Sequence, residues 1–294
     1  MPVSFLTQEQ RERFGRYQGA PTSEDLARYF HLDDTDLARI AEKRGDHNRL
    51  GFAVQLGTVR YLGTFLDAGT TVPPSVIRSV ASQLGIDAAI GIDAYSGGRW
   101  RLRHAAEIRV AYGYVEIADP RVGFRLTRWL YALCWTGTDR PGLLFERATA
   151  WLVTHKVLLP SYSTLERYIA TLRGRVEERV WRSLAKCIDT EQAQRLERLL
   201  TVPSGSRNSL LDQLRCGPVM VSSVSLVHAL LRLREVRDLG VRLPATVRVP
   251  DSRVTALARY AGSAKARAIQ RMPDLCPRRF KTDQVYRLKS GQGR

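Results

Sequence analysis

A run of hydrogen-bonding side chains stands at the expected start of a helix near the middle of the chain. The run consists of Ser161, Tyr162, Ser163 and Thr164, and Arg167 follows about one turn later. Hydroxyl groups and the planar guanidinium fork are suited to base edges in a DNA groove and to phosphates. The same helix continues with Arg173, Arg175 and Arg179. The pattern predicts DNA contact, and the alternative is an amphipathic helix with a hydroxyl cap and a solvated arginine face.

A second cluster of polar side chains precedes a long apolar segment that begins near residue 50. The cluster consists of Arg44, His47, Asn48 and Arg49. Two interpretations remain open: contact with DNA, or a loop and cap for the helix that follows.

A helix-turn-helix-like pair would position the hydroxyl run. In the segment Ala148–Arg175, the first helix is expected to end near Lys156, and the second is expected to start at Ser163. The turn between them, Leu158–Ser161, is longer than the minimal type. The second helix would then present the hydroxyl run to a major groove.

An earlier segment, Glu24–Arg44, also has the spacing of a helix-turn-helix. Ala27 is the small residue expected where its two helices cross, and Leu32 falls in the turn. Leu37 and Ile40 are expected to face back from the second helix.

Acidic residues weaken the case for DNA reading by this earlier pair. They stand at the start of its second helix and are Asp33, Asp34 and Asp36. Acids there stabilise the helix dipole but repel DNA. We therefore expect Arg39 on this helix to contribute less to DNA recognition than Arg167, and the alternative is an ordinary helical hairpin with acidic caps.

Helical spacing of apolar residues continues along nearly the whole chain. Thr7 with Gln10 has the spacing of a capping box, and Thr22 or Ser23 is expected to cap a helix through Phe30. Strand-like alternation appears only weakly, at Val241–Val249. We predict an all-α, multi-helix fold with helix-turn-helix-like units. The expected parts are two helical DNA-binding subdomains, a helical linker and a basic tail, at residues 1–99, 100–202, 203–274 and 275–294.

The net charge of +17 predicts a polyanionic or acidic partner. The charge is uneven along the sequence. Residues 1–100 hold 11 basic and 12 acidic residues, residues 101–200 hold 17 and 11, and residues 201–294 hold 18 and 6. The middle and the end therefore supply the basic surface.

Several other classes of protein are excluded by the sequence. No stretch approaches the roughly 20 apolar residues of a membrane span, and the start has no secretory signal, so we expect a cytoplasmic protein without membrane contact. The four cysteines are widely spaced, form no CxxC pair, and are expected to be reduced. No nucleotide-binding, nucleophile-elbow or metal-binding motif is present. We therefore assign no catalytic residue and no metal ligand.

An ordered set of short strings resembles the N-terminal region of replicative transposases of the Tn-three family. The strings are Pro2–Thr7, Leu26–Leu32, Arg44–Ala53, Thr58–Phe65, Arg128–Ala132, Ala150–Val153, Val202–Arg207 and Ala268–Pro273. The resemblance covers residues 1 to about 274, and its specificity lies in the order of the set rather than in any one string. From about Leu275 the sequence departs from the family pattern, which indicates a truncation followed by a non-homologous basic tail.

The resemblance implies a bacterial protein that binds double-stranded DNA at the terminal inverted repeats of a transposon. In the family, a later ribonuclease-H-like domain holds metal with three acids and cuts and joins strands. We expect this chain to be inactive alone and to need no cofactor, with magnesium serving only that other domain. Full-length transposase is a second candidate partner, and the bacterial nucleoid is the expected location. Two alternatives remain: a truncated regulator that inhibits transposition, and a general basic interaction module.

Overall fold

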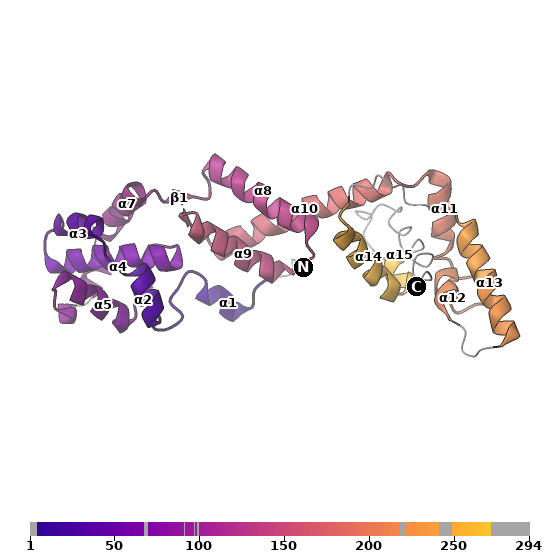
Figure 1. Ribbon diagram of the computed structural model, residues 1–294, viewed down its shortest axis with the longest axis horizontal. Coiled ribbons are helices and arrows are strands. Elements are labelled where there is room, and N and C mark those ends of the chain that lie inside the picture. Colours follow the sequence, from indigo (N-terminus) through magenta and orange to yellow (C-terminus); the bar gives the residue numbers. More distant parts are fainter. Residues whose placement is uncertain are drawn as a thin grey trace. The chain divides into compact units, whose positions relative to one another are not determined.

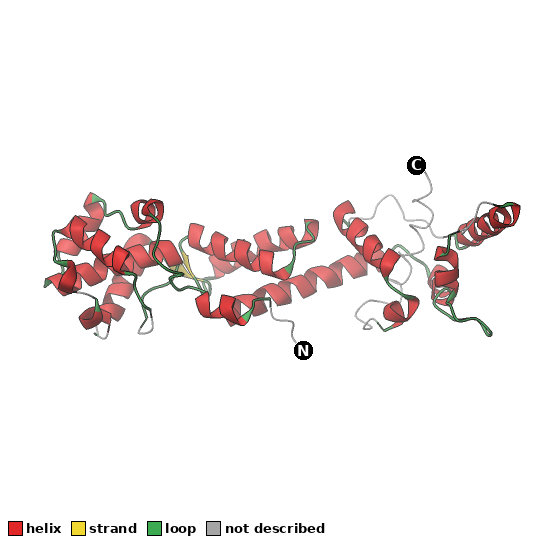
Figure 2. Cartoon of the chain, turned by 90° about the horizontal axis from the view of Figure 1, so that it is seen from below, coloured by secondary structure: helices red, strands yellow, loops and turns green. Residues whose placement is uncertain are grey.

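The computed structural model describes residues 5–67, 70–90, 92–96, 98, 100–217, 222–240 and 249–271. Its regular structure is almost entirely helical, which confirms the all-α prediction (Figures 1 and 2). The predicted tail, and the weak strand pattern except for Val249, lie outside the described residues. None of the described helices is long and apolar enough to cross a membrane.

The chain forms two compact units, Met1–Leu130 with Arg140–Ala170 and Tyr131–Asp139 with Thr171–Arg294. The four predicted subdomain boundaries stay predictions. Two helices, α8 (Pro120–Thr136) and α10 (Tyr162–Ala185), contribute residues to both units. The first unit also contains α1 (Gln8–Arg13), α2 (Ser23–Tyr29), α3 (Asp34–Ala41), α4 (Asp46–Leu62), α5 (Pro74–Leu84), the 3₁₀ helix η1 (Ala88–Ile90), α6 (Asp93–Ser96), α7 (Trp100–Tyr112), β1 (Val115–Glu116), α9 (Pro141–Thr154) and β2 (Val157–Leu158). The second unit contains α11 (Thr190–Arg198), α12 (Leu210–Arg215), α13 (Ser223–Asp238), α14 (Asp251–Ser263) and α15 (Ala266–Gln270).

Helix α4 is the centre of the first unit. All residues from Leu50 to Val59 are buried, and α2, α3, α5, α6 and α7 pack on this helix. A helix that is apolar on every side belongs in a core, which explains the long apolar segment in the sequence. Two glycines allow aromatic rings to lie on its backbone. A Cβ at Gly51 or at Gly57 would stand 2.2 Å from the ring of Tyr95 or Phe30, respectively.

The ends of several helices follow local sequence signals. Capping boxes at Thr7 and Thr22 start α1 and α2, as predicted. Gly63 ends α4 in the left-handed conformation, with φ 74°, and its carbonyl accepts a hydrogen bond of 2.9 Å from the Leu159 amide. This contact ties α4 to the segment that leads into α10.

A short parallel pair of strands, β1 and β2, was not predicted (yellow in Figure 2). Val115 pairs with Val157, and Glu116 pairs with Leu158. The pair fixes the connection between α9 and α10, so this connection is an ordered segment rather than only a turn. Within the first unit, the Tyr168 hydroxyl donates to the Gly123 carbonyl at 3.1 Å and hydrogen bonds with Thr127, which joins α10 to α8.

The second unit has a small core of its own. Its central members come from α11, α12 and α15 and the segments beside them: Leu196, Leu199, Leu200, Leu211, Ala266 and Ile269. Arg215 at the end of α12 donates to the carbonyls of Ala261 and Ala264, with 2.7 Å to the latter. Helix α13 takes little part, since Val236 is its one buried residue.

Candidate nucleic-acid interface

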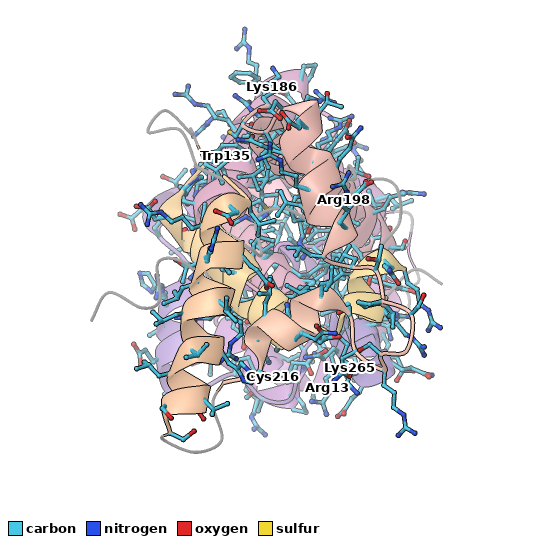
Figure 3. The ribbon with its side chains drawn as sticks, turned by 90° about the vertical axis from the view of Figure 1, so that its right-hand side faces the viewer. Arg13, Trp135, Lys186, Arg198, Cys216 and Lys265 are labelled. Carbon is cyan, nitrogen blue, oxygen red and sulfur yellow. The ribbon has the colours of Figure 1, made fainter. Side chains whose placement is uncertain are left out.

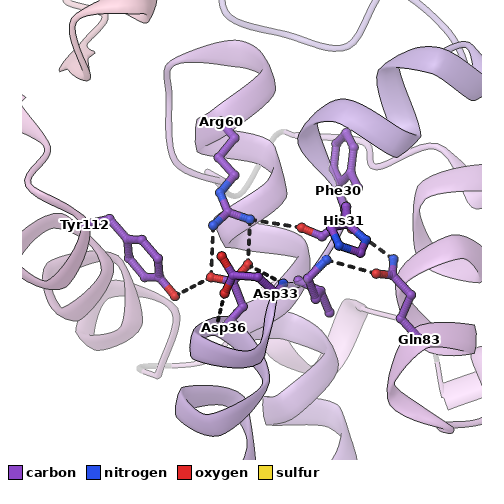
Figure 4. Close-up of polar contacts among 8 residues, drawn as sticks. Phe30, His31, Asp33, Asp36, Arg60, Gln83 and Tyr112 are labelled. Atoms are coloured by element: carbon purple, nitrogen blue, oxygen red, sulfur yellow. Dashed lines mark hydrogen bonds and ion pairs between the residues drawn. The ribbon is translucent and has the colours of Figure 1, made fainter.

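Asp36, one of the acids expected to repel DNA, is buried in the first unit and paired (Figure 4). Its carboxylate accepts hydrogen bonds from both terminal nitrogens of Arg60 at 2.8 and 2.9 Å, and from the Tyr112 hydroxyl at 2.7 Å. It also completes the capping box of α3 by accepting from the Asp33 amide at 3.2 Å. Asp33 and Asp34 are exposed, whereas the charge of Asp36 is neutralised by these contacts. Its role is to join α3 to α4 and α7.

The pKa values in this cluster follow from the same contacts. Burial alone would raise the pKa of Asp36, but the hydrogen bonds from Arg60 and Tyr112 outweigh it and leave the pKa below its usual value. Burial likewise opposes the charge of Arg60, but the Asp36 carboxylate outweighs burial and raises the pKa of Arg60. Burial and the bond to Asp36 raise the pKa of Tyr112. Asp36 and Arg60 are therefore a stable ion pair at neutral pH.

The first predicted helix pair differs from a helix-turn-helix at two positions. Leu32 and Ile40 are buried as expected, but Ala27 is exposed and Leu37 is 36% exposed. Both α2 and α3 pack against α4, so Ala27 does not mark a close crossing. Arg39 is half-buried, and its guanidinium carbon lies 5.9 Å from the ring centre of Tyr112.

The cluster at residues 44–49 surrounds the start of α4. The Asn48 amide donates to the Arg44 carbonyl at 2.8 Å, and Arg49 donates to the Lys43 carbonyl at 3.1 Å. These bonds hold Asn48 and Arg49 against the loop before α4, and no side chain of the described residues caps the helix start at Gly45. The side chains of Arg44 and His47 are exposed.

The hydroxyl run lies at the start of α10, as the sequence suggested. Ser161 caps this helix, because the Thr164 amide donates to its Oγ at 3.3 Å. The same Oγ lies 3.1 Å from the Ser163 hydroxyl and 2.9 Å from the Thr164 hydroxyl. Ser161, Ser163 and Arg167 are exposed, whereas Tyr162 and Thr164 are half-buried. The first turns of α10 therefore present hydroxyl groups and a guanidinium group to solvent.

A groove of about 710 Å³ adjoins this helix start within the first unit. Its lining includes Ser161 and Tyr162 from the start of α10, and Arg11 and Arg16 from α1 and the turn after it. The guanidinium carbon of Arg11 lies 5.5 Å from the ring centre of Tyr162. Among the described residues, the Arg11 Nε is one of few buried side-chain donors without a hydrogen-bond partner. The sequence analysis missed Arg11 and Arg16, because only the fold brings α1 beside α10.

The three later arginines of α10 belong to the second unit and have different surroundings. Arg173 is half-buried and lies 3.7 Å from Glu177. Arg179 donates to the Tyr131 hydroxyl at 3.0 Å, with its guanidinium 5.3 Å from the ring centre of Trp135. Arg175 is exposed. Arg175 is therefore the best placed of the three for a ligand that approaches from solvent.

The described residues contain no group of three or more His, Cys, Asp or Glu side chains that could hold a metal ion. The exposed side chains at the start of α10 instead offer hydroxyl donors and a positively charged guanidinium group. Together the fold and the site define a helical domain whose candidate contacts suit an anionic ligand.

Residues 5–172 of the chain match the family described as "Domain of unknown function (DUF4158)". This stretch covers more than half of the chain and includes the start of α10. The chain belongs to that family.

The chain is also similar to transposases, which confirms the resemblance found in the sequence. It is 45% identical to the transposase for transposon gamma-delta of Escherichia coli (strain K12) over 274 residues, which are 93% of this chain and 27% of that protein. It is 32% identical to the transposase for transposon Tn501 of Pseudomonas aeruginosa, over 82% of this chain and 24% of that protein. It is 30% identical to the transposase for transposon Tn1546 of Enterococcus faecium, over 87% and 26%. The chain spans about a quarter of the length of these relatives.

Proposed function

We propose that this chain binds double-stranded DNA at the terminal inverted repeats of a transposon, as the DNA-recognition part of a transposase. The first turns of α10 lie in the major groove in this proposal. The observation that carries it is the exposed set Ser161, Ser163 and Arg167 at a capped helix start, in a chain similar to transposases. Transposition is thus the process in which the chain takes part.

The surroundings of this helix start support the proposal in two ways. The hydroxyl groups and Arg167 are neutral and positive donors, and such donors serve both base edges and phosphates. The groove beside them adds two guanidinium groups, Arg11 and Arg16, as donors for a DNA backbone, next to the acids Glu12 and Asp67 of the same lining. The start of α3 offers a poorer surface, since Asp33 and Asp34 are exposed there.

The test is a set of gel-shift titrations at about 150 mM salt, where purely electrostatic binding is weak. One duplex carries the terminal repeat of the transposon around this gene, a second carries the repeat of transposon gamma-delta, and a third has random sequence. We expect the first duplex to bind at least a hundredfold more tightly than the random one. Equal affinity for all three duplexes would contradict the proposal.

Substitutions then separate base reading from phosphate binding. Arg167→Ala should weaken binding to the cognate repeat by about 1–3 kcal/mol and change random binding less. Arg175→Ala should weaken both equally and reduce the slope of log affinity against log salt by about one. Arg39→Ala is the control on the other helix pair and should do less than Arg167→Ala. If Arg39→Ala abolishes specific binding and Arg167→Ala does not, α3 is the reading helix and the assignment to α10 is wrong.

A further inference from the structure

Helix α13 of the second unit exposes an unusual amount of apolar surface. Six of its aliphatic side chains are 45–63% exposed. They are Val224, Leu226, Val227, Leu230, Leu231 and Leu233. Isolated exposed apolar residues are ordinary, but a continuous set on one helix marks a surface that binds something.

These six residues form two stripes along the helix. Leu226, Leu230 and Leu233 recur with spacings of four and three and share one side. Val224, Val227 and Leu231 recur with spacings of three and four and share another side. Val236 and the half-buried Ala229 face the rest of the unit. A helix that is apolar on several sides is normally enclosed within a larger protein.

The second stripe leads into a groove of about 620 Å³ between α12 and α13. Its lining includes Leu210 and Leu214 from α12, Leu231 from α13, and Cys216, the residue that ends α12 (labelled in Figure 3). Cys216 is exposed and therefore reports on whether this groove is covered.

The geometry points to α13 as a docking helix for the remainder of a full-length transposase of this family. This chain covers 27% of the gamma-delta transposase, so most of that protein lies outside the match and can enclose the helix. A second copy of this chain fits less well. Two identical helices that meet around a twofold axis bury the same stripe on each, and the other stripe stays exposed. This inference does not depend on DNA binding.

The test compares this chain alone with a chimera in which its matched residues replace their counterparts in the gamma-delta transposase. Both proteins are treated with iodoacetamide, and the alkylation rate of each cysteine is followed by peptide mass spectrometry. We expect Cys216 to react at least tenfold more slowly in the chimera. Cys187, which is half-buried at the end of α10, is the internal control and should react at similar rates in both.

Paired substitutions identify the surface. Val227→Glu with Leu231→Glu, on the stripe that leads into the groove, should restore the fast reaction of Cys216 in the chimera. Val227→Ala with Leu231→Ala is a milder pair that should restore it in part. The matched control is Leu102→Glu with Val110→Glu on α7, where the side chains are 65% and 78% exposed and Cys216 should stay protected.

Three results would overturn the inference. Cys216 could react equally fast in the chain and in the chimera, or its protection could survive the Val227 and Leu231 substitutions. In the third, light scattering finds a dimer of the chain alone that the same substitutions dissociate, which assigns α13 to a second copy.

Discussion

Asp36→Asn removes one charge from the buried network that joins α3, α4 and α7. The carboxylate accepts from two nitrogens of Arg60, from the Tyr112 hydroxyl and from the Asp33 amide. Asparagine keeps one acceptor oxygen, and its amide NH₂ must then face a donor. At least one N–H of Arg60 consequently loses its partner, whichever way the amide is oriented.

The expected cost is about 3 kcal/mol in the free energy of unfolding of the first unit. Removal of one partner of a buried ion pair costs about 3–5 kcal/mol. The side chain of Arg60 is 24% exposed, so water can compensate part of the loss and the lower end applies. For a unit of this size, a loss of 3 kcal/mol lowers the melting temperature by roughly 6–12 °C.

The assay is differential scanning calorimetry at pH 7, with urea unfolding followed by circular dichroism. Asp34→Asn is the matched control, since Asp34 is exposed in the same helix turn, and should change the free energy by less than about 0.5 kcal/mol. Replacing both partners, with Asp36→Leu and Arg60→Met, should cost less than Asp36→Leu alone, because no buried charge is left unpaired. A loss below about 0.5 kcal/mol for Asp36→Asn would refute the argument.

Three further outcomes are expected. Acid should destabilise the first unit, because the pKa of Asp36 is lower in the folded state than in the unfolded state. The stabilisation by Asp36 is complete well above the unfolded pKa of about 3.9 and is lost as the pH falls through the lower folded value. Urea titrations between pH 7 and 2 would detect this loss of stability, which should be shallower for Asp36→Asn. Gly57→Ala should destabilise the first unit by about 1–3 kcal/mol, because the added Cβ meets the Phe30 ring at 2.2 Å. Gly174→Ala, with open space around it, should stabilise α10 by up to about 1 kcal/mol. Equal melting temperatures for the two variants would contradict this. Arg16→Ala in the groove beside α10 should weaken cognate and random DNA alike in gel shifts, and a loss restricted to cognate DNA would instead make Arg16 a base-reading residue.

The sequence was a good guide to the helices, because apolar spacing and capping residues act over one or two turns. Thr7 and Thr22 cap the helices that they were expected to cap. The strands β1 and β2 were missed because each has two residues, too few for an alternating pattern. Their pairing depends on contacts between segments far apart in the chain.

The candidate site could likewise be predicted from the sequence only in part. The hydroxyl run could be found from its order along one helix, and it lies at the start of α10. The burial of Asp36 could not be found, since its partners Arg60 and Tyr112 are 24 and 76 residues away. The acids of α3 look alike in sequence, and only packing shows that one of them is neutralised inside the unit.

The central position of α4 has a consequence for the dynamics of the first unit. Amide hydrogens exchange with solvent only when their hydrogen bonds open, and those of a fully enclosed helix open last. The amides from Leu50 to Val59 should therefore exchange only when the whole unit unfolds, and their protection should report its global stability. The two glycines sharpen this expectation, because α4 cannot move away from Tyr95 and Phe30 without leaving gaps against its own backbone. The slowest amide exchange in the first unit should therefore be found in α4.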